Sequence, residues 1–236
     1  MVCWVAERAG AASNVDRVIV ATDSQQIADA VRAHGLEAAM TAAHHTSGTD
    51  RVAEAAASIP EAEIIVNVQG DEPLISPATI ELAVETMATE ISKQNGAGIV
   101  TTWEPIDSID DVFNPDLVKV VLDDNGDAVY FSRSPIPYPR DAVKRYGSID
   151  AALKNEPELF KLFRKHTGLY VYRRDVLLQF TQWPQFPLEQ IEALEQLRAL
   201  AHGVKIKVVK ACSASTGVDT VADLEKVKEV LEELTV

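Results

Sequence analysis

The stretch IIVNVQGDEPL, Ile64–Leu74, decides the fold class predicted for this chain. Its branched apolar residues predict a buried strand, which stops at Gly70 and is followed at once by two acids and a proline. In an open α/β sheet, ligands bind beyond the carboxyl ends of the strands, and Asp71 follows such an end directly. Gly70 lets another group approach the backbone closely. The stretch therefore predicts a strand that leads into a binding site.

The flanking sequence repeats the same order of strand and helix. DRVIVATD (Asp16–Asp23) predicts a strand, and the helical spacing in Ser24–Gly35 predicts a helix after it. GLEAAMT predicts a second strand before a helix over Asp50–Ile59. The opening stretch is followed by a helix over Ser76–Glu90, with serine as N-cap and proline at the first helical position. This alternation predicts an α/β fold with a three-layer, doubly wound, mostly parallel sheet.

The second half of the chain is less regular. Leu117–Ser132 predicts two strands joined at DDNGD, and the proline-rich SPIPYPRD must be a loop. PLEQIEALEQLRALAHG (Pro187–Gly203) predicts one amphipathic helix that ends at Gly203, with Leu188, Ile191, Leu194 and Leu197 along one face. TVADLEKVKEVLEEL predicts a closing helix. We expect a single domain over residues 1–236, with an inserted lid and dimerisation region at about 130–185.

Composition excludes several classes of protein. The chain has 236 residues and a formal net charge of -14, which disfavours wrapping nucleic acid because phosphate backbones demand a basic surface. A few focused basic side chains can still attract a small anion into a cleft. No apolar stretch approaches the ~20 residues that cross a membrane, and no signal peptide is visible. Cys3 and Cys212 lie far apart and do not suggest a disulfide framework. We expect a cytoplasmic protein without membrane insertion.

Two aspartates occupy comparable places in the predicted sheet. Asp71 follows one strand, and Asp219 in STGVDT lies between a strand at KIKVVKA and the closing helix. Two carboxylates at neighbouring strand ends suit Mg²⁺, which prefers oxygen ligands and is often completed by substrate phosphates. The alternative, that each acid only caps a helix or a turn, stays open. The sequence lacks a P-loop, a dinucleotide-binding glycine motif and a nucleophile elbow.

A set of motifs spread over the whole chain resembles one enzyme family. HHTSGTDRVAEA, IIVNVQGDEPLI, FNPDLVKVVLD, YFSRSPIP, HTGLYVYRRDVL, PLEQIEALEQLR and STGVDTVADLEKV resemble the 3-deoxy-manno-octulosonate cytidylyltransferases, or CMP-Kdo synthetases. The resemblance implies that CTP and the eight-carbon sugar acid Kdo give CMP-Kdo and pyrophosphate, for lipopolysaccharide synthesis. It also implies a homodimer, and Mg²⁺ held by Asp71 and Asp219.

The resemblance further implies roles for individual side chains. It makes Arg133 the candidate that offsets the repulsion between the sugar carboxylate and the triphosphate, beside Asp71 and Asp219 as catalytic groups. The expected nucleotide contacts are Ser47, Gly48, Thr49, Arg51 and Gln69. The expected sugar contacts are Gln69, Arg133, His166, Tyr170 and Glu189. Structural alternatives stay open for three of them. Arg133 could be a surface arginine beside a proline loop, and His166 a partly buried strand histidine. Glu189 could be a first-turn acid favoured by the helix dipole.

The beginning of the sequence departs from the family pattern. The family's first strand and its basic loop, of the type A-R-x-x-S-x-R-L-P-x-K, have no counterpart, and MVCWVAERAGAAS matches the helix that follows them. We expect the strands next to that position to expose unpaired edges. One hypothesis is a longer enzyme with the family activity. The alternatives are a catalytically impaired homologue that acts as a binding or partner subunit, and a cytidylyltransferase for another sugar acid.

Overall fold

The computed structural model describes residues 1–45, 47–215, 217–218, 225, 227 and 229. The chain divides into two compact units. Unit 1 comprises Met1–Val100, Gly168–Gln182 and Ala211–Val236, and unit 2 comprises Thr101–Thr167 and Trp183–Lys210. The predicted closing helix falls largely outside the described residues.

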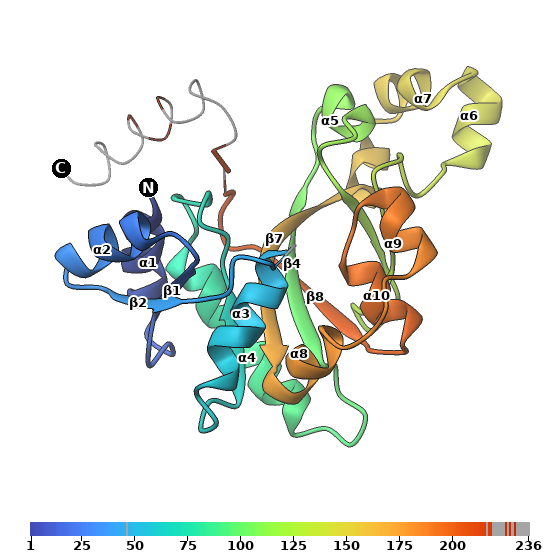
Figure 1. The fold of residues 1–236 in the computed structure, drawn as a ribbon. Helices are drawn as coiled ribbons and strands as arrows, with labels where there is room; N and C mark the ends of the chain where they lie inside the picture. The colour runs from blue at the N-terminus through green and yellow to red at the C-terminus, as the bar shows by residue number, and fades with distance from the viewer. Residues whose placement is uncertain (46, 216, 219–224, 226, 228, 230–236) are drawn as a thin grey trace. The chain divides into compact units, whose positions relative to one another are not determined.

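Unit 1 contains the strand and helix alternation that the sequence predicts (Figure 1). Its elements are α1 (Val2–Gly10), β1 (Ile19–Thr22), α2 (Gln25–Ala33), β2 (Glu37–Met40), α3 (Gly48–Ala57), β3 (Ile64–Asn67), α4 (Pro77–Ile91) and α8 (Arg174–Phe180). Two strands run through both units, β4 (Ile99–Pro105) and β7 (Arg164–Arg173). The α/β class predicted from the sequence is confirmed.

Serine side chains start the helices that follow the strands of unit 1. Ser24 Oγ accepts from Ile27 N at 3.4 Å at the start of α2, and Ser76 Oγ accepts from Thr79 N at 3.4 Å, as predicted for α4. The helix predicted from Asp50 begins two residues earlier, at Gly48, because Ser47 Oγ accepts from the Asp50 N–H at 3.1 Å. Each cap satisfies an N–H group that has no partner within the helix.

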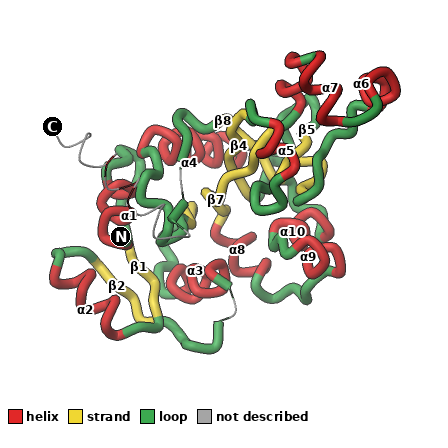
Figure 2. The backbone as a smooth tube through the Cα atoms, turned by 90° about the horizontal axis from the view of Figure 1, so that it is seen from above, coloured by secondary structure: helices red, strands yellow, loops and turns green. Residues whose placement is uncertain are grey.

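The strands of unit 1 form two separate pairings. β1 and β2 make a two-stranded parallel sheet, with Ile19 opposite Glu37. β3 runs antiparallel to the second half of β7, with Ile64 opposite Arg173 and Asn67 opposite Tyr170. Helices α1 and α4 pack together on one side of these strands and α3 and α8 pack together on the other (Figure 2). Strands covered on both sides can be apolar along their length, as the first three residues of β3, Ile64–Val66, are.

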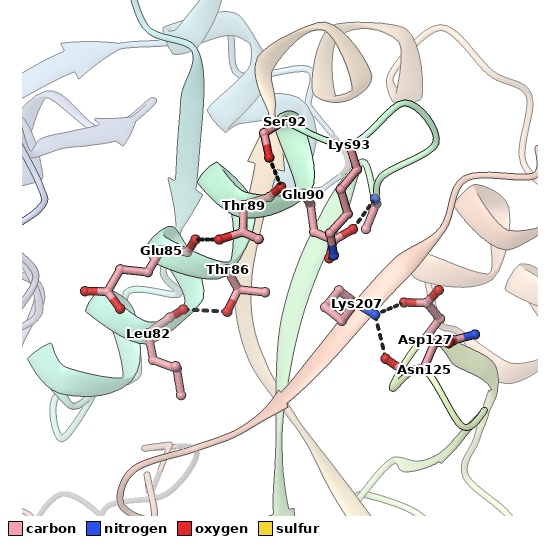
Figure 3. Close-up of polar contacts among 11 residues, drawn as sticks. Leu82, Glu85, Thr86, Thr89, Glu90, Ser92, Lys93, Asn125, Asp127 and Lys207 are labelled. Carbon is pink, nitrogen blue, oxygen red and sulfur yellow. Dashed lines mark hydrogen bonds and ion pairs between the residues drawn. The ribbon is translucent and has the colours of Figure 1, made fainter.

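Unit 2 is built around a sheet with the strand order β6-β5-β7-β4-β8. Its other elements are α5 (Ile109–Phe113), β5 (Lys119–Leu122), β6 (Ala128–Ser132), α6 (Arg140–Tyr146), α7 (Ile149–Asn155), the 3-10 helix η1 (Pro157–Leu162), α9 (Pro187–Glu192), α10 (Gln196–Ala201) and β8 (Ile206–Lys210). β5 runs antiparallel to β6 and pairs with β7 at Lys165. Lys207 Nζ holds the predicted turn between β5 and β6, through Asn125 O at 2.7 Å and an ion pair with Asp127 at 2.5 Å (Figure 3).

The end of α4 is fixed by a buried carboxylate. Glu90 is buried, and its Oε2 accepts from Ala97 N at 2.9 Å while its Oε1 pairs with Lys93 Nζ at 2.5 Å (Figure 3). Gly96 packs directly on this turn, because a Cβ there would lie 1.9 Å from the Glu90 carbonyl oxygen. The chain can therefore reverse from α4 into β4 only with glycine at this position.

The single helix predicted over Pro187–Gly203 is wrong. α9 ends at Glu192 and α10 begins at Gln196, with Ala193 in the left-handed region at φ 52°. Leu194 N donates to Glu189 O at 3.1 Å, which closes the turn. The break turns Ile191 out to 79% exposure while Leu194 is buried. Polar contacts of Glu189 and Glu192 stabilise the break between α9 and α10. The spacing of hydrophobic residues carries no information about these polar contacts.

The segment LYVYRRDVLLQF contributes mainly to the core. Val171, Tyr172, Leu177 and Phe180 are all buried. Among the described residues, no helix is long and apolar enough to cross a membrane.

Candidate active site

The turn after β3 exposes the aspartate that the sequence singled out. Asn67, the last residue of β3, is 2% exposed, and its Oδ1 accepts from Gln69 Nε2 at 3.3 Å. Glu72 N donates to Gln69 O at 3.2 Å, which closes a turn around Gly70 and Asp71. Asp71 is exposed and Glu72 is half-buried. The strand therefore delivers an amide and a carboxylate to the end of the sheet.

The segment before Asp219 lies against this turn. Val218 N donates to Asp71 O at 2.8 Å, and Ser215 Oγ donates to the Glu72 carboxylate. Asp219 itself lies outside the described residues. The QGD and GVD motifs thus come into contact through Asp71 and Val218, the residue before Asp219.

Glycines allow the loops around Gln69 to approach closely. A Cβ at Gly48 would lie 3.2 Å from Gln69 Oε1, and one at Gly168 would lie 3.7 Å from Gln69 Cγ. A Cβ at Gly217 would lie 3.9 Å from Asp71 O. Since 3.2 Å is tighter than an ordinary carbon contact, a side chain at Gly48 would displace the Gln69 amide. The structure therefore brings the predicted residues Gly48, Gln69 and Asp71 together in unit 1.

The first turn of α3 carries the other residues predicted to contact the nucleotide. Ser47 Oγ is used as the helix cap, and Thr49 is buried. Arg51 Nη1 donates to Thr41 Oγ1 at 2.6 Å, and Nη2 lies 3.1 Å from an Asp23 carboxylate oxygen. This pair fixes the direction of the Arg51 guanidinium and partly balances its charge.

Arg133 in unit 2 is held by main-chain oxygens. Its Nε donates to Glu192 O at 2.7 Å and its Nη1 to Pro115 O at 2.8 Å. Its Nη2 lies 3.5 Å from the carbonyl oxygen of Ala193, the residue with positive φ. These contacts give Arg133 a structural role, as an anchor between the end of β6 and the break after α9, whatever ligand it meets.

Glu192, which the sequence analysis missed, completes this anchor. Its carboxylate accepts from Ser132 Oγ at 2.6 Å and from Arg133 N at 2.9 Å. Burial raises the pKa of Glu192, but these donors and Tyr130 outweigh that effect and leave the pKa below its usual value. Its only signal in the sequence is an acid within PLEQIEALE, on a helix where acids are ordinary surface residues.

Lys119, also missed, is a fully buried lysine. Its Nζ donates to Asn114 O at 2.8 Å and to Leu117 O at 2.6 Å. Burial, and then the charge of Arg133, lower its pKa. Lys119 and Arg133 therefore hold the FNPDL loop from two sides through its carbonyl groups.

Glu189 forms a buried ion pair. Its Oε2 accepts from Arg198 Nε at 2.9 Å and from Phe186 N at 3.0 Å, and its Oε1 pairs with Arg198 Nη2. Burial raises the pKa of Glu189, but these donors more than compensate, so the pKa lies below its usual value. The Phe186 contact closes the N-terminus of α9, which agrees with the first-turn alternative left open by the sequence.

The two ring residues predicted for the sugar pocket have protein partners as well. His166 Nε2 lies 2.9 Å from Thr101 Oγ1, and the ring meets Phe131 edge-on with centroids 5.0 Å apart. Burial of the imidazole lowers the pKa of His166 to about 3, so the ring is neutral at pH 7. Tyr170, in unit 1, stacks on Tyr172 at 5.9 Å. Arg133, His166 and Glu189 each engage different partners within unit 2.

Of the two aspartates predicted to hold magnesium, the structure describes Asp71. Among the described residues, no group of at least three His, Cys, Asp or Glu side chains could hold a metal ion. Asp71 offers an exposed carboxylate beside the Ser215–Val218 segment, and carboxylate oxygens are the donors that Mg²⁺ prefers. The pairing of Asp71 with Asp219 stays a prediction.

The parallel β1–β2 pair, the helices on both faces and the polar turn after β3 are features of open α/β folds, which bind ligands beyond the carboxyl ends of their strands. The chain belongs to the cytidylyltransferase family, whose sequence model matches residues 1–206. Within that family its relatives are 3-deoxy-manno-octulosonate cytidylyltransferases, the CMP-Kdo synthetases. The one from Geobacter metallireducens is 49% identical over 98% of this chain and 87% of the relative. The one from Neisseria gonorrhoeae is 46% identical over 98% of this chain and 88% of the relative.

Solved structures agree with this assignment. A CMP:2-keto-3-deoxy-manno-octonic acid synthetase complexed with CTP superposes with a TM-score of 0.84 and 39% identity, over 98% of this chain and 87% of that one. A 4-diphosphocytidyl-2C-methyl-D-erythritol synthase from Anaerococcus prevotii has a TM-score of 0.59 and 13% identity over 98% and 86%. The second likeness shows the shared fold alone.

Proposed function

We propose that this protein activates Kdo with CTP to give CMP-Kdo and pyrophosphate. The observation that carries the proposal is the meeting of the QGD and GVD motifs, through the Val218 N to Asp71 O hydrogen bond of 2.8 Å. Relatives of nearly the same length carry the name of this activity, and a similar structure was solved with CTP.

The reaction requires that a sugar oxygen approach a negatively charged triphosphate. The anomeric oxygen of the sugar attacks the α-phosphorus, the bond to the pyrophosphate oxygen breaks, and pyrophosphate leaves with the electron pair. Such transfers depend on positioning and on neutralising charge rather than on a covalent nucleophile. We assign positioning of the nucleotide to Gln69 and the Ser47–Arg51 segment, because Gly48 packs against Gln69.

Mg²⁺ is the proposed cofactor, with Asp71 and Asp219 as its protein ligands. When bound, it would neutralise phosphate charge and polarise the α-phosphoryl group. The exposed Asp71 carboxylate supports this assignment through its donor chemistry and its place at a strand end.

The sugar side of the site is assigned to Arg133, His166, Tyr170 and Glu189. His166 is a neutral hydrogen-bonding group, because its pKa of about 3 excludes a charged imidazolium at pH 7. Arg133 and Glu189 already have protein partners, so we assign them to shaping the pocket unless a ligand displaces those partners. A cytoplasmic homodimer that supplies lipopolysaccharide synthesis, with a lid and dimerisation region at about 130–185, completes the proposal.

Pyrophosphate release with CTP and Kdo tests the activity directly. Turnover that requires Mg²⁺, falls at least about 100-fold in Asp71→Asn and stays unchanged in Asp124→Asn would support the proposal. Asp124 is an exposed acid of the turn between β5 and β6 and serves as the matched control. Sialic acid in place of Kdo distinguishes a cytidylyltransferase for another sugar acid. Ligand binding without turnover would instead support a binding or partner subunit.

A further inference from the structure

Three neighbouring strands of the sheet in unit 2 bring an aromatic ring and two cations together. The strands lie in the order β7-β4-β8 (Figure 1). Trp103 is on β4, Arg164 is the first residue of β7, and Lys210 is the last residue of β8. Arg164 Cζ lies 5.1 Å from the centroid of the Trp103 ring, and Lys210 Nζ lies 5.9 Å from the same centroid. One indole therefore makes cation–π contacts with two side chains of like charge, which repel each other.

The two faces of this sheet differ in how their charges are balanced. On one face, Lys165 of β7 pairs with Glu104 of β4 at 3.0 Å. Arg164 and Trp103 directly precede these two residues, so they lie on the opposite face, because successive side chains of a strand alternate. Among the described residues, no carboxylate forms an ion pair with Arg164 or with Lys210. The chain has 36 acidic residues against 22 lysines and arginines, so composition does not explain why an acid is missing here.

The hydrogen-bond donors of the two cations are left without protein acceptors. Arg164 Nε is buried and has no hydrogen-bond acceptor among the described residues, which is unfavourable for a buried N–H group. Tryptophan is a donor only in conventional hydrogen bonds, so Trp103 takes none of these N–H groups. Arg164 is half-buried and Lys210 is exposed, so a small ligand can reach both side chains.

The next pair of side chains on the same face is uncharged. It consists of His166 and Thr101, whose Nε2 and Oγ1 atoms lie 2.9 Å apart. Burial lowers the pKa of His166 to about 3, so its ring is neutral at pH 7. This pair neither repels an anion nor supplies the missing acid, and the positive charge of Arg164 and Lys210 stays uncompensated beside it.

We propose that Trp103, Arg164 and Lys210, the Trp103 subsite, bind the phosphate group of a small molecule. Phosphate oxygens accept hydrogen bonds from both cations at once, and a phosphate monoester carries close to two negative charges at pH 7. The planar guanidinium of Arg164 matches phosphate geometry, and Lys210 adds a point charge. Trp103 holds both cations in place before the ligand arrives. The acidic chain disfavours a nucleic acid as the source of the phosphate. This inference does not depend on the proposed activity.

Fluorescence of Trp103 in the full chain reports binding at this subsite. Trp4→Phe combined with Trp183→Phe leaves Trp103 as the single tryptophan. Inorganic phosphate is expected to change the Trp103 emission along a saturable curve, with a Kd near about 1 mM, which corresponds to two hydrogen bonds to charged groups. Sodium chloride at the same ionic strength is expected to give no saturable change. The same curve with chloride, or no saturation well above the expected Kd, would overturn the proposal.

Two exposed lysines at opposite ends of β8 locate the binding. Lys210→Met removes a cation of the subsite, and Lys205→Met makes the same change in charge just before the strand. We expect Lys210→Met to weaken phosphate binding about 10-fold, the value of one charge-assisted hydrogen bond, and Lys205→Met to leave it unchanged. Equal effects of the two variants would show a general effect of charge and refute the subsite.

Arg164 is tested by two substitutions of different charge. Arg164→Met is expected to weaken phosphate binding at least about 10-fold, and Arg164→Lys is expected to weaken it less, because the charge remains and the fork geometry is lost. Unchanged phosphate binding in Arg164→Met would refute the subsite. If Arg164→Met does not fold, the comparison of Lys210→Met with Lys205→Met still decides the question, because both of those side chains are exposed.

A second probe separates two sources of the phosphate group. Glycerol 3-phosphate that binds more tightly than inorganic phosphate, and loses this affinity in Lys210→Met, would identify a phosphate monoester as the ligand. Equal affinities, both lowered in Lys210→Met, would identify free phosphate. Affinities for both probes that do not change in Lys210→Met would place the binding elsewhere and overturn the proposal.

Discussion

Replacement of Arg198 by methionine is expected to destabilise the protein strongly, because it leaves Glu189 buried without its counter-charge. Glu189 is 4% exposed and Arg198 is 7% exposed, and the Arg198 guanidinium reaches both carboxylate oxygens of Glu189. Removal of one partner from a buried pair costs about 3–5 kcal/mol. For a chain of this size, that loss corresponds to a fall of about 6–20 °C in the unfolding midpoint.

A double-mutant cycle separates the pair from its surroundings. Glu189→Gln keeps an acceptor for Phe186 N, which lies 3.0 Å from Glu189 Oε2. We expect Arg198→Met combined with Glu189→Gln to recover most of the stability lost in Arg198→Met, to within about 1–2 kcal/mol of the native protein, since no buried charge remains. Urea unfolding followed by circular dichroism measures each corner of the cycle.

The pH dependence gives an independent check with a defined sign. In the native protein the pKa of Glu189 lies below its unfolded value of about 4.3. Its contribution is therefore present above that value and lost as the pH falls through the folded pKa. In Arg198→Met, burial without a cation raises the folded pKa, so stability is regained as the pH falls. A cost below about 1 kcal/mol at pH 7, with the native pH dependence retained, would refute this reasoning.

Three further substitutions test other contacts. Burial lowers the pKa of His166 to about 3 from 6.5, so the native protein loses stability as the pH falls below about 6.5. His166→Gln should reduce this dependence of the free energy of unfolding on pH. An NMR titration in which His166 titrates near 6.5 would contradict the prediction. Gly48→Ala should raise the KM for CTP several-fold with a smaller effect on kcat, because the new Cβ would lie 3.2 Å from Gln69 Oε1; unchanged kinetics would remove Gln69 from the nucleotide site. Ala193→Gly should raise the free energy of unfolding by about 0.5–1 kcal/mol, because alanine costs about 1–2 kcal/mol in the left-handed region. The gain is smaller than that cost because glycine also raises the conformational entropy of the unfolded chain. A lower free energy of unfolding in the variant would contradict the assigned strain.

Local sequence chemistry predicted unit 1 well, because its signals act over a few residues. The serines before α2 and α4 and the branched run of β3 each specify structure through their own neighbours. The strand was predicted to stop at Gly70, whereas β3 ends at Asn67 and the turn closed by Gln69 and Glu72 follows it. Its partner segment, Ser215–Val218, was predicted from the general rule that ligands gather at strand ends, together with a family resemblance.

The helix predicted over Pro187–Gly203 shows where such signals fail. Its apolar spacing is regular, yet Glu192, the last residue of α9, binds the end of β6, and Glu189 pairs with an arginine nine residues later. Glu192 and Arg133 are 59 positions apart in the sequence, so local spacing cannot predict their contact. Three polar contacts offset the loss of helical hydrogen bonds at Ala193.

The sequence by itself determined the α/β class, the strand that begins at Ile64 and the motifs that place the chain among the cytidylyltransferases. Periodicity, caps and turn residues act within one element, so they can be seen in one element's sequence. Only the tertiary structure decided that Arg133 and Glu189 are already bonded to protein groups, and that Lys119 and Glu192 hold the loops beside them. Each of these depends on which distant residues share a desolvated space, and burial decides the strength of a charge or an unmet hydrogen bond.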